Sequence, residues 1–122
     1  MLSRRFATLL GLFLVVEGIW ELFSPVVFGV FSSNTLHGVI HIALGVIGLW
    51  VARKGTERSW LIGVGGLLIV VGCCYFIPGT SRLVVSLLNV NTAVAIFNVV
   101  VGLICLGVAL ISERQVEAAR PA

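Results

Sequence analysis

Four ionisable side chains lie inside apolar stretches of the chain, and their spacing groups them into two pairs. Glu17 and Glu21 are four residues apart, and so are His37 and His41. A spacing of four places both members of a pair on one face of a helix. Imidazole and carboxylate groups bind metals and carry protons, so these four residues form the candidate cofactor-binding site.

The depths of the two pairs match. Glu21 and His37 each lie two residues from the end of an apolar stretch, whereas Glu17 and His41 each lie six residues inside one. Six residues correspond to about 9 Å along a helix. In a helical hairpin we therefore expect Glu21 to face His37 and Glu17 to face His41, because ionisable groups in a membrane need a partner or a wet cavity.

The composition indicates that lipid surrounds the helices that position these residues. The chain has 122 residues, of which 59% are hydrophobic and 11% charged, and its mean hydropathy is +1.16. A soluble domain carries about 25% charged residues. Each of four apolar stretches is close to the ~20 residues that span a bilayer as a helix, and none shows the alternation of a membrane strand. These stretches are residues 6–23, 35–52, 59–77 and 92–111.

We predict from these spans an all-α, polytopic membrane four-helix bundle that forms a single transmembrane domain over residues 1–122. Short loops rich in Lys and Arg stay on the cytoplasmic side of a membrane. Only Arg82 falls on the opposite side from the other basic residues, which are Arg4, Arg5, Arg53, Lys54, Arg58, Arg114 and Arg120. We therefore expect both termini on the cytoplasmic face of a bacterial cytoplasmic or thylakoid-type membrane. The expected partner is the lipid bilayer, not nucleic acid, because no basic stripe with interleaved aromatic residues is present.

The chain also contains an apparent internal repeat. Shifting the sequence by 57 residues superposes Ser24 on Ser81, Asn34 on Asn91, Thr35 on Thr92, Gly45 on Gly102 and Leu49 on Leu106. Both halves, residues 1–57 and 58–114, start on the same side of the membrane. We therefore predict two parallel-repeated helical hairpins related by a pseudo-twofold axis along the membrane normal.

This alignment extends the candidate site to the second half. It places Glu17 on Cys74 and His41 on Asn98, which predicts these four residues at one level of the bundle. The metal-ligand candidates are then His41, Glu17 and Cys74, while a single imidazole could instead be an axial ligand of haem or chlorophyll. Proton handling is a third alternative. In a fourth, a Glu and a His satisfy each other with one hydrogen bond and only fix the helix register.

Other residues have predicted structural roles. Asn34 and Asn91 precede the second and fourth spans and are expected to cap them, and Asn98 is a polar residue inside the fourth span. Pro25 and Pro78 fit helix exits. Trp20, Trp50 and Trp60 lie toward span ends, where indole rings favour the membrane interface.

A family resemblance follows from these motifs. The pattern Asn34-Thr35-x-His37-x-x-x-His41-x-x-x-Gly45-x-x-Gly48-Leu49 is echoed by Phe76-Ile77-Pro78-Gly79 and by Leu88-Asn89-Val90-Asn91-Thr92, with Asn98 and Gly102. It resembles an uncharacterised four-helix bacterial membrane family, a domain of unknown function found in actinobacteria and cyanobacteria. The resemblance implies an Asn near the start of each even-numbered span and a His followed four residues later by Gly. That family tends to carry a second His where this chain has Asn98.

A weaker likeness is to DoxX-type four-helix proteins, which implies a link to redox-active membrane complexes. Neither family supplies an established activity. We expect no catalytic residues, because the chain shows no nucleophile with a base, no phosphate loop and no extramembrane domain. The leading interpretation is a small non-enzymatic membrane component that packs with a larger complex or with itself. The alternative is binding of a metal, haem or chlorophyll, or proton handling, at the Glu/His site.

Overall fold

The computed structural model describes residues 2–119, except for the side chains of residues 113–117. The described part is all-α apart from one short β-hairpin. Its helices are α1 (Leu2–Phe23), α2 (Thr35–Lys54), α3 (Glu57–Phe76), α4 (Pro78–Leu88) and α5 (Thr92–Ala118), and its strands are β1 (Val26–Val27) and β2 (Phe31–Ser32). Four of the helices, α1, α2, α3 and α5, are long and apolar enough to cross a membrane. The predicted four-span, all-α architecture is therefore confirmed.

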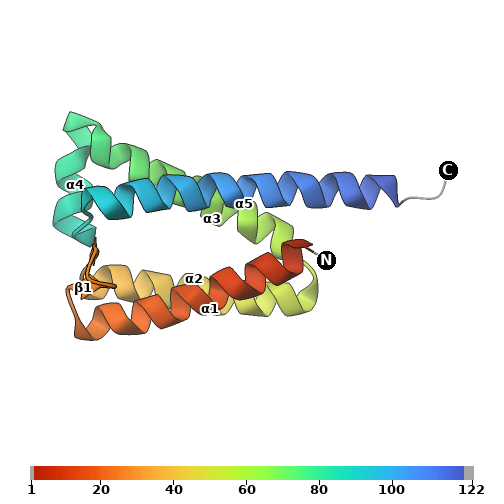
Figure 1. Cartoon of the computed structure of the whole chain (residues 1–122), viewed down its shortest axis with the longest axis horizontal. Helices are drawn as coiled ribbons and strands as arrows, with labels where there is room; N and C mark the ends of the chain where they lie inside the picture. The colour runs from red at the N-terminus through yellow and green to blue at the C-terminus, as the bar shows by residue number, and fades with distance from the viewer. Residues whose placement is uncertain (1, 120–122) are drawn as a thin grey trace.

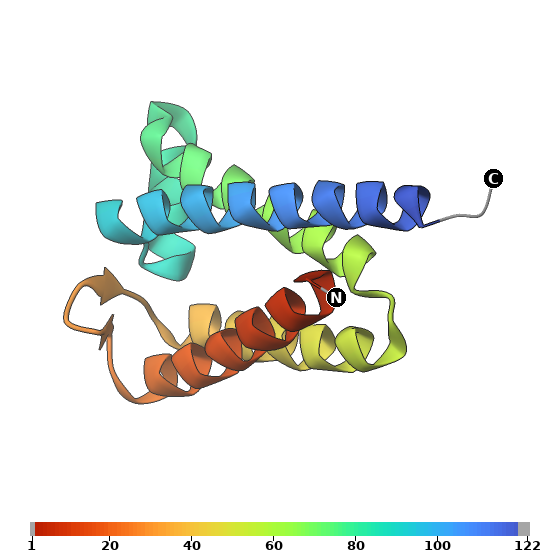
Figure 2. The same cartoon turned by 45° about the vertical axis from the view of Figure 1, so that its right-hand side comes forward.

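The four long helices form two hairpins. Helix α1 packs along α2, helix α3 packs along α5, and contacts between the two hairpins are sparser (Figure 1). Helix α1 begins and α5 ends at the same end of the bundle, while α4 and the β-hairpin lie at the other end (Figures 1 and 2). The connection between α2 and α3 is short, because Gly55 adopts a left-handed conformation with φ of 76° and closes α2.

Each hairpin is closed by small residues that let the two backbones touch. A Cβ atom on Gly18 would lie 2.7 Å from the carbonyl oxygen of Gly38, and one on Gly102 would lie 2.6 Å from that of Gly65. Lipid offers little hydrophobic drive for helix pairing, so close packing of this kind is what holds membrane helices together. The complete set of contacts is Gly11 with Gly45, Gly18 with Gly38, Gly65 with Gly102, and Gly72 with Ala95.

These contacts also give the correspondence between the two hairpins. Between α2 and α5, the numbers of equivalent residues differ by 57, as in the pairs 38 and 95, and 45 and 102. Between α1 and α3, they differ by 54, as in the pairs 11 and 65, and 18 and 72. The 57-residue alignment is therefore displaced by about one helical turn for the odd-numbered spans. By packing, Glu17 corresponds to Val71 and not to Cys74. Glu21 corresponds to Tyr75.

The two connections at the α4 end fold differently. After α1, strands β1 and β2 pair antiparallel around Phe28 and Gly29, whose φ values of 55° and 69° are those of a tight hairpin turn. After α3, helix α4 begins at Pro78 and ends at Leu88, and its C-cap Asn89 has φ of 52°. The prediction that Pro78 fits a helix exit is confirmed, because α3 ends at Phe76 with Ile77 as its C-cap. The fixed φ and missing N–H of Pro78 also suit the first turn of α4, a helix that the sequence pattern does not predict.

Two asparagines hold the connections together. Oδ1 of Asn34 accepts a hydrogen bond from the His37 N–H, and Oδ1 of Asn91 accepts one from the Val94 N–H, both at 2.9 Å. The predicted capping is thus confirmed for both helices. Each side-chain amide also crosses to the other hairpin's connection, with Nδ2 of Asn34 donating to the Leu87 carbonyl and Nδ2 of Asn91 to the Val30 carbonyl.

Trp60 joins the two hairpins within the bundle. Its ring fits against Gly48, where an added Cβ would lie 2.4 Å from the ring, and its Nε1 donates to the Leu44 carbonyl at 3.2 Å. Trp60 lies in the first turn of α3, near the end of its span as predicted, but its side chain is buried between the hairpins. An apolar core surrounds it and fills the bundle from Ala7 to Leu14 of α1.

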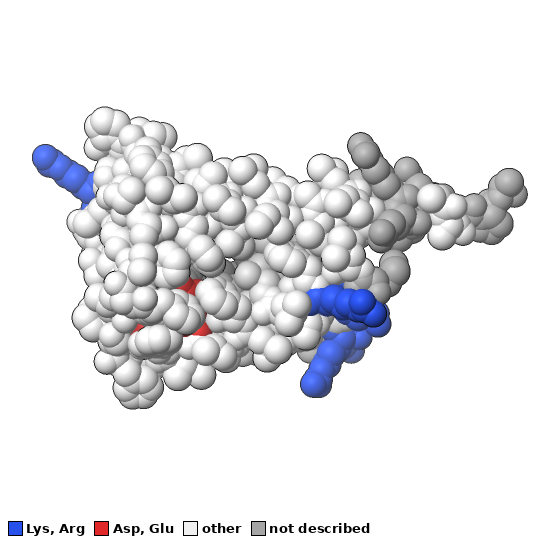
Figure 3. Space-filling view, viewed as in Figure 1, with Lys and Arg blue, Asp and Glu red and all other residues white. Residues whose placement is uncertain are grey.

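Charged side chains are distributed unevenly over the described part of the chain. Figure 3 shows basic side chains gathered at the end where α1 begins, and one basic side chain at the α4 end. Of the predicted basic positions, Arg120 and the side chain of Arg114 lie outside the described residues. Acidic atoms are visible in this view only as small patches among atoms of uncharged residues (Figure 3).

Candidate functional site

The four candidate residues all point into the protein. Glu17 and His41 are each 5% exposed, Glu21 is 3% exposed and His37 is 4% exposed. They come from the last two turns of α1 and the first two turns of α2, next to the connections at the α4 end. Lipid-facing side chains at these helix positions would be far more exposed, so the ionisable groups occupy the interior of the bundle.

The pairing differs from the one expected from depth. Nδ1 of His41 lies 2.8 Å from Oε1 of Glu21 and 3.7 Å from Oε2 of Glu17. Glu21 packs against Gly38, since a Cβ on Gly38 would lie 3.0 Å from the Glu21 Cβ. Gly38 lies between the two histidines in the helix, and its missing side chain lets the Glu21 carboxylate reach His41.

His37 has a different partner on its Nδ1 side. This nitrogen lies 3.1 Å from the carbonyl oxygen of Leu88 at the end of α4. A carbonyl only accepts, so His37 donates from Nδ1 and carries its free lone pair on Nε2. His37 therefore links the first hairpin to the second connection and keeps one nitrogen available for a ligand.

Ser33 completes the contacts of the Glu21 carboxylate, and sequence reasoning missed it. Its Oγ donates to Oε2 of Glu21 at 2.7 Å. The one signal in the sequence was its place directly before the capping residue Asn34, which puts it beside the start of α2. Glu17 is less well satisfied, because its buried Oε2 has no hydrogen-bond partner among the described residues.

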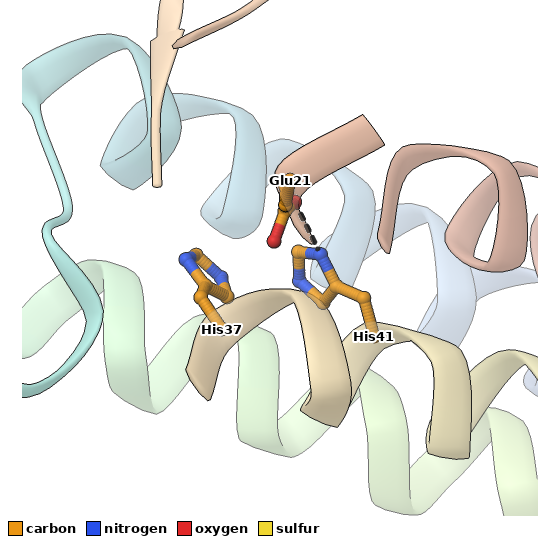
Figure 4. A group of neighbouring side chains, drawn as sticks. All are labelled: Glu21, His37 and His41. Carbon is orange, nitrogen blue, oxygen red and sulfur yellow. Dashed lines mark hydrogen bonds and ion pairs between the residues drawn. The ribbon is translucent and has the colours of Figure 1, made fainter. Parts of the chain in front are cut away.

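Three of the candidates converge in a geometry that suits a metal ion. One ligand atom from each of Glu21, His37 and His41 lies within 4.8 Å of the others, and all three residues are buried. The two imidazole rings lie side by side, with centroids 4.3 Å apart, and the carboxylate lies above them (Figure 4). Ligand atoms about 2.1 Å from one tetrahedral ion lie about 3.4 Å apart, so shifts of about 1.5 Å would close the site.

The hydrogen bonds outside this group resemble those of known metal sites. Metal-binding histidines usually donate their second ring nitrogen to a carboxylate or a backbone carbonyl, which fixes the ring and its tautomer. Here Nδ1 of His37 faces the Leu88 carbonyl, so Nε2 of His37 remains as the nitrogen that could bind an ion. Nδ1 of His41 faces the Glu21 carboxylate itself, so an ion shared by these two residues would replace the proton between them.

Cys74 and Asn98 were expected at the level of His41, and the structure brings one of them close. Asn98 lines a cavity of about 110 Å³ together with His37 and His41, and aliphatic side chains complete its wall. Cys74 neither lines this cavity nor joins the three-residue group; it packs against the apolar cluster around Val94. Pockets for drug-sized ligands measure about 300–1,000 Å³, so this cavity does not fit a haem or chlorophyll.

A larger hollow opens on the other side of Glu21, at the α4 end. It has a volume of about 410 Å³, and Glu21 and Ser33 lie in its wall with Asn34, Thr35 and Asn89. We call it the outer hollow. Glu21 lines this partly polar hollow, whereas its partner His41 lines the small, mostly aliphatic cavity between the hairpins.

Comparison with known proteins places the chain in a family. Residues 24–111 match the sequence model of a family described as Domain of unknown function (DUF4383), a match that begins after α1 and so includes the two histidines but not Glu17 or Glu21. No curated protein and no solved structure matches the chain. The likeness to DoxX-type proteins is not confirmed, whereas the resemblance to an uncharacterised family is. The protein belongs to this family of unknown function, over more than half of its length.

Proposed function

We propose that the protein binds a divalent transition-metal ion inside the membrane, through Glu21, His37 and His41. The observation that carries this proposal is the convergence of three buried ligand atoms, from two helices, within 4.8 Å of one another. Two imidazoles and one carboxylate suit first-row metals such as zinc, iron, cobalt or nickel. Three protein ligands leave coordination positions open for water or a substrate, as in catalytic and transport sites.

A second observation supports a cation at this place. Glu17 is buried beside His41 and leaves Oε2 without a hydrogen-bond partner among the described residues. Two buried carboxylates therefore lie near one pair of imidazoles. A buried charge is costly unless it is paired or binds a metal, and a divalent ion would compensate both carboxylates at once.

The topology that we propose follows from the charged residues. Five of the basic side chains, Arg4, Arg5, Arg53, Lys54 and Arg58, lie in the segments at the end of the bundle where α1 begins. The rule that such residues stay in the cytoplasm puts both termini on that side, in a bacterial cytoplasmic or thylakoid-type membrane. The α4 end and the outer hollow then face the opposite aqueous phase.

We also propose that the two hairpins are copies of one unit, which together form a single transmembrane domain. The support is that they bury corresponding positions. Buried residues 3, 7, 10, 11, 14 and 18 of α1 correspond, in that order, to buried residues 57, 61, 64, 65, 68 and 72 of α3. Buried residues 37, 38, 41, 45 and 52 of α2 correspond in the same way to 94, 95, 98, 102 and 109 of α5. A parallel repeat of this kind explains how the Glu/His site could be confined to one of two similar frameworks.

The second candidate function is a non-enzymatic component of a larger membrane complex or a homo-oligomer. Two observations favour it. Glu21 has hydrogen-bond partners in Ser33 and His41, so the network could serve structure alone. Gly63, Gly66 and Gly107 have open space where a Cβ would be, so the backbone of a partner helix could approach there.

Metal analysis of the detergent-purified protein separates the two functions. We expect one ion per chain and, after exchange to Co²⁺, visible absorption bands from the bound ion. Both should be lost in His37→Ala, His41→Ala and Glu21→Gln. The matched control is Val94→Ala, at the position of the second hairpin that corresponds to His37.

Retention of the metal by all three ligand variants, or the absence of binding by the unchanged protein, would contradict the metal site. The structural role would then be the better interpretation. Folding of each variant is checked by its elution as a single species in detergent, so that loss of metal is not confused with loss of structure.

A further inference from the structure

We infer that the metal ion reaches its site from one side of the membrane only, through the outer hollow, so that the protein captures a hydrated cation and does not conduct it across. This inference rests on the proposed metal site and adds a direction and a source to it. Three observations support it: the partly polar hollow that Glu21 lines, the apolar core beyond Glu17, and the uneven distribution of basic residues.

The outer hollow gives a partly polar route to the ligands. It has a volume of about 410 Å³, enough for a partly hydrated ion, and Ser33, Asn34 and Asn89 contribute hydroxyl or amide groups to its wall. The Glu21 carboxylate forms part of this wall and also contacts His41 at 2.8 Å. An ion that exchanges water for this carboxylate is therefore already within reach of the histidines.

The opposite direction is closed by apolar packing. Along α1, the next buried polar side chain beyond Glu17 is Ser3, fourteen residues or about 21 Å further along the helix. The intervening core consists of tightly packed aliphatic and aromatic side chains, including Leu14, Leu68 and Trp60. A cation in such surroundings would lose its water without gaining ligands, so this core is a barrier.

The charge distribution favours the same direction. In the described part of the chain, Arg82 of α4 is the one basic residue near the outer hollow's end, whereas five basic residues lie at the other end. A cation approaching from the α4 end therefore meets little repulsion and is drawn to a carboxylate. The ligand class is a hydrated divalent first-row metal from the non-cytoplasmic solution.

Two matched threonines allow a direct test. Thr35 lies in the wall of the outer hollow, whereas Thr8 lies with Arg4 and Arg5 in the wall of a hollow of the same volume, about 410 Å³, at the other end. Neither is a proposed ligand. In Co²⁺-loaded protein in lipid nanodiscs, we expect Thr35→Trp to slow removal of the metal by EDTA about tenfold, a factor equivalent to about 1.4 kcal/mol of barrier, and Thr8→Trp to leave the rate unchanged.

A second measurement, which needs no variant, asks from which face of the membrane the metal can be removed. EDTA does not cross membranes, so it should strip the metal when added to spheroplasts, which expose the non-cytoplasmic face, and not when added to inverted vesicles. A tag at the C-terminus reports which face is exposed. Equal stripping from both faces, or equal rates for the two tryptophan variants, would overturn the inference while leaving the metal site intact. Failure of the unchanged protein to hold any metal would overturn both.

Discussion

The two hairpins of this protein share a framework but differ in what they bury. In each, two contacts between small residues bring the helices together, at Gly11–Gly45 and Gly18–Gly38 in the first and at Gly65–Gly102 and Gly72–Ala95 in the second. The first hairpin then buries Glu21, His37 and His41. The corresponding residues of the second are Tyr75, Val94 and Asn98.

This difference shows that helix pairing and the candidate site are separable. The second hairpin forms with an apolar cluster around Val94 and Ala95, and its Tyr75 is bonded to Thr92 near the end of the bundle. The Glu/His network is therefore not required to hold two such helices together. Its presence in one hairpin only is more simply explained by binding than by folding.

The largest contrast between the hairpins is expected at His41 and its counterpart Asn98. His41→Ala removes the hydrogen-bond partner of a buried carboxylate, and breaking a buried pair in this way costs about 3–5 kcal/mol. Among the described residues, no charged group is bonded to Asn98, so Asn98→Ala should cost about 1 kcal/mol, a typical value for a single substitution. The free energy of unfolding in detergent, measured by denaturant titration, gives both values.

A double variant identifies the cause of that cost. In His41→Ala combined with Glu21→Gln, the buried charge is removed along with its partner, and Ser33 can still donate to the amide oxygen. We expect the double variant to be more stable than His41→Ala alone, because the two effects are coupled and not additive. Simple addition of the two costs would show that the Glu21–His41 contact contributes little.

The shared framework predicts that a larger side chain at the glycine contacts destabilises the protein equally in the two hairpins. A side chain at Gly45 or Gly102 would lie 2.6 Å from the carbonyl oxygen of the facing glycine, so Gly45→Val and Gly102→Val should each destabilise the protein by about 1–3 kcal/mol through overpacking. Gly63→Val is the control, because nothing lies within 4 Å of its added Cβ. Thermal unfolding in detergent checks the order; a much larger effect in one hairpin would contradict a common framework.

Much of this framework could be predicted from the sequence, because lipid imposes a simple pattern. Each span needs an apolar run of a set length, and Asn34 and Asn91 mark the starts of α2 and α5. Helix α4 could not be predicted, because Pro78 fits the exit of α3 as well as the first turn of a further helix. The 57-residue shift misaligned α1 with α3, because the apolar residues of two spans can be matched at many different shifts. The backbone contacts between glycines are compatible with one alignment only.

The residues of the candidate site could be predicted from the sequence, but the contacts between them could not. Four ionisable residues in apolar spans are visible in any sequence, and burial follows from the cost of exposing them to lipid. Which carboxylate meets which imidazole depends on Gly38, whose missing side chain lets Glu21 reach past His37 to His41. The Leu88 carbonyl belongs to a connection whose backbone is set by tertiary packing, so no sequence pattern indicates it. The one sequence signal for Ser33 is its place directly before Asn34.

The smallest contrast is expected at the two capping asparagines. Loss of an N-cap costs about 1 kcal/mol, so Asn34→Ala and Asn91→Ala should lower the unfolding free energy by similar amounts. Only Asn34 is bonded to a candidate ligand, since its Oδ1 accepts from the His37 N–H. Asn34→Ala should therefore also weaken Co²⁺ binding by about tenfold, the lower end of the range for residues that orient metal ligands, whereas Asn91→Ala should not.

Asn34→Asp refines this last comparison, because aspartate keeps the oxygen that caps α2 but loses the amide that donates to the Leu87 carbonyl. If the cap alone orients His37, Asn34→Asp retains the affinity for Co²⁺ measured by absorption titration. If the bond to the second hairpin's connection is what holds the ring in place, the aspartate variant binds as weakly as the alanine one. Equal Co²⁺ affinities for the Asn34→Ala and Asn91→Ala variants would instead mean that the start of α2 does not affect the metal site. That result would contradict the role of His37 as a metal ligand.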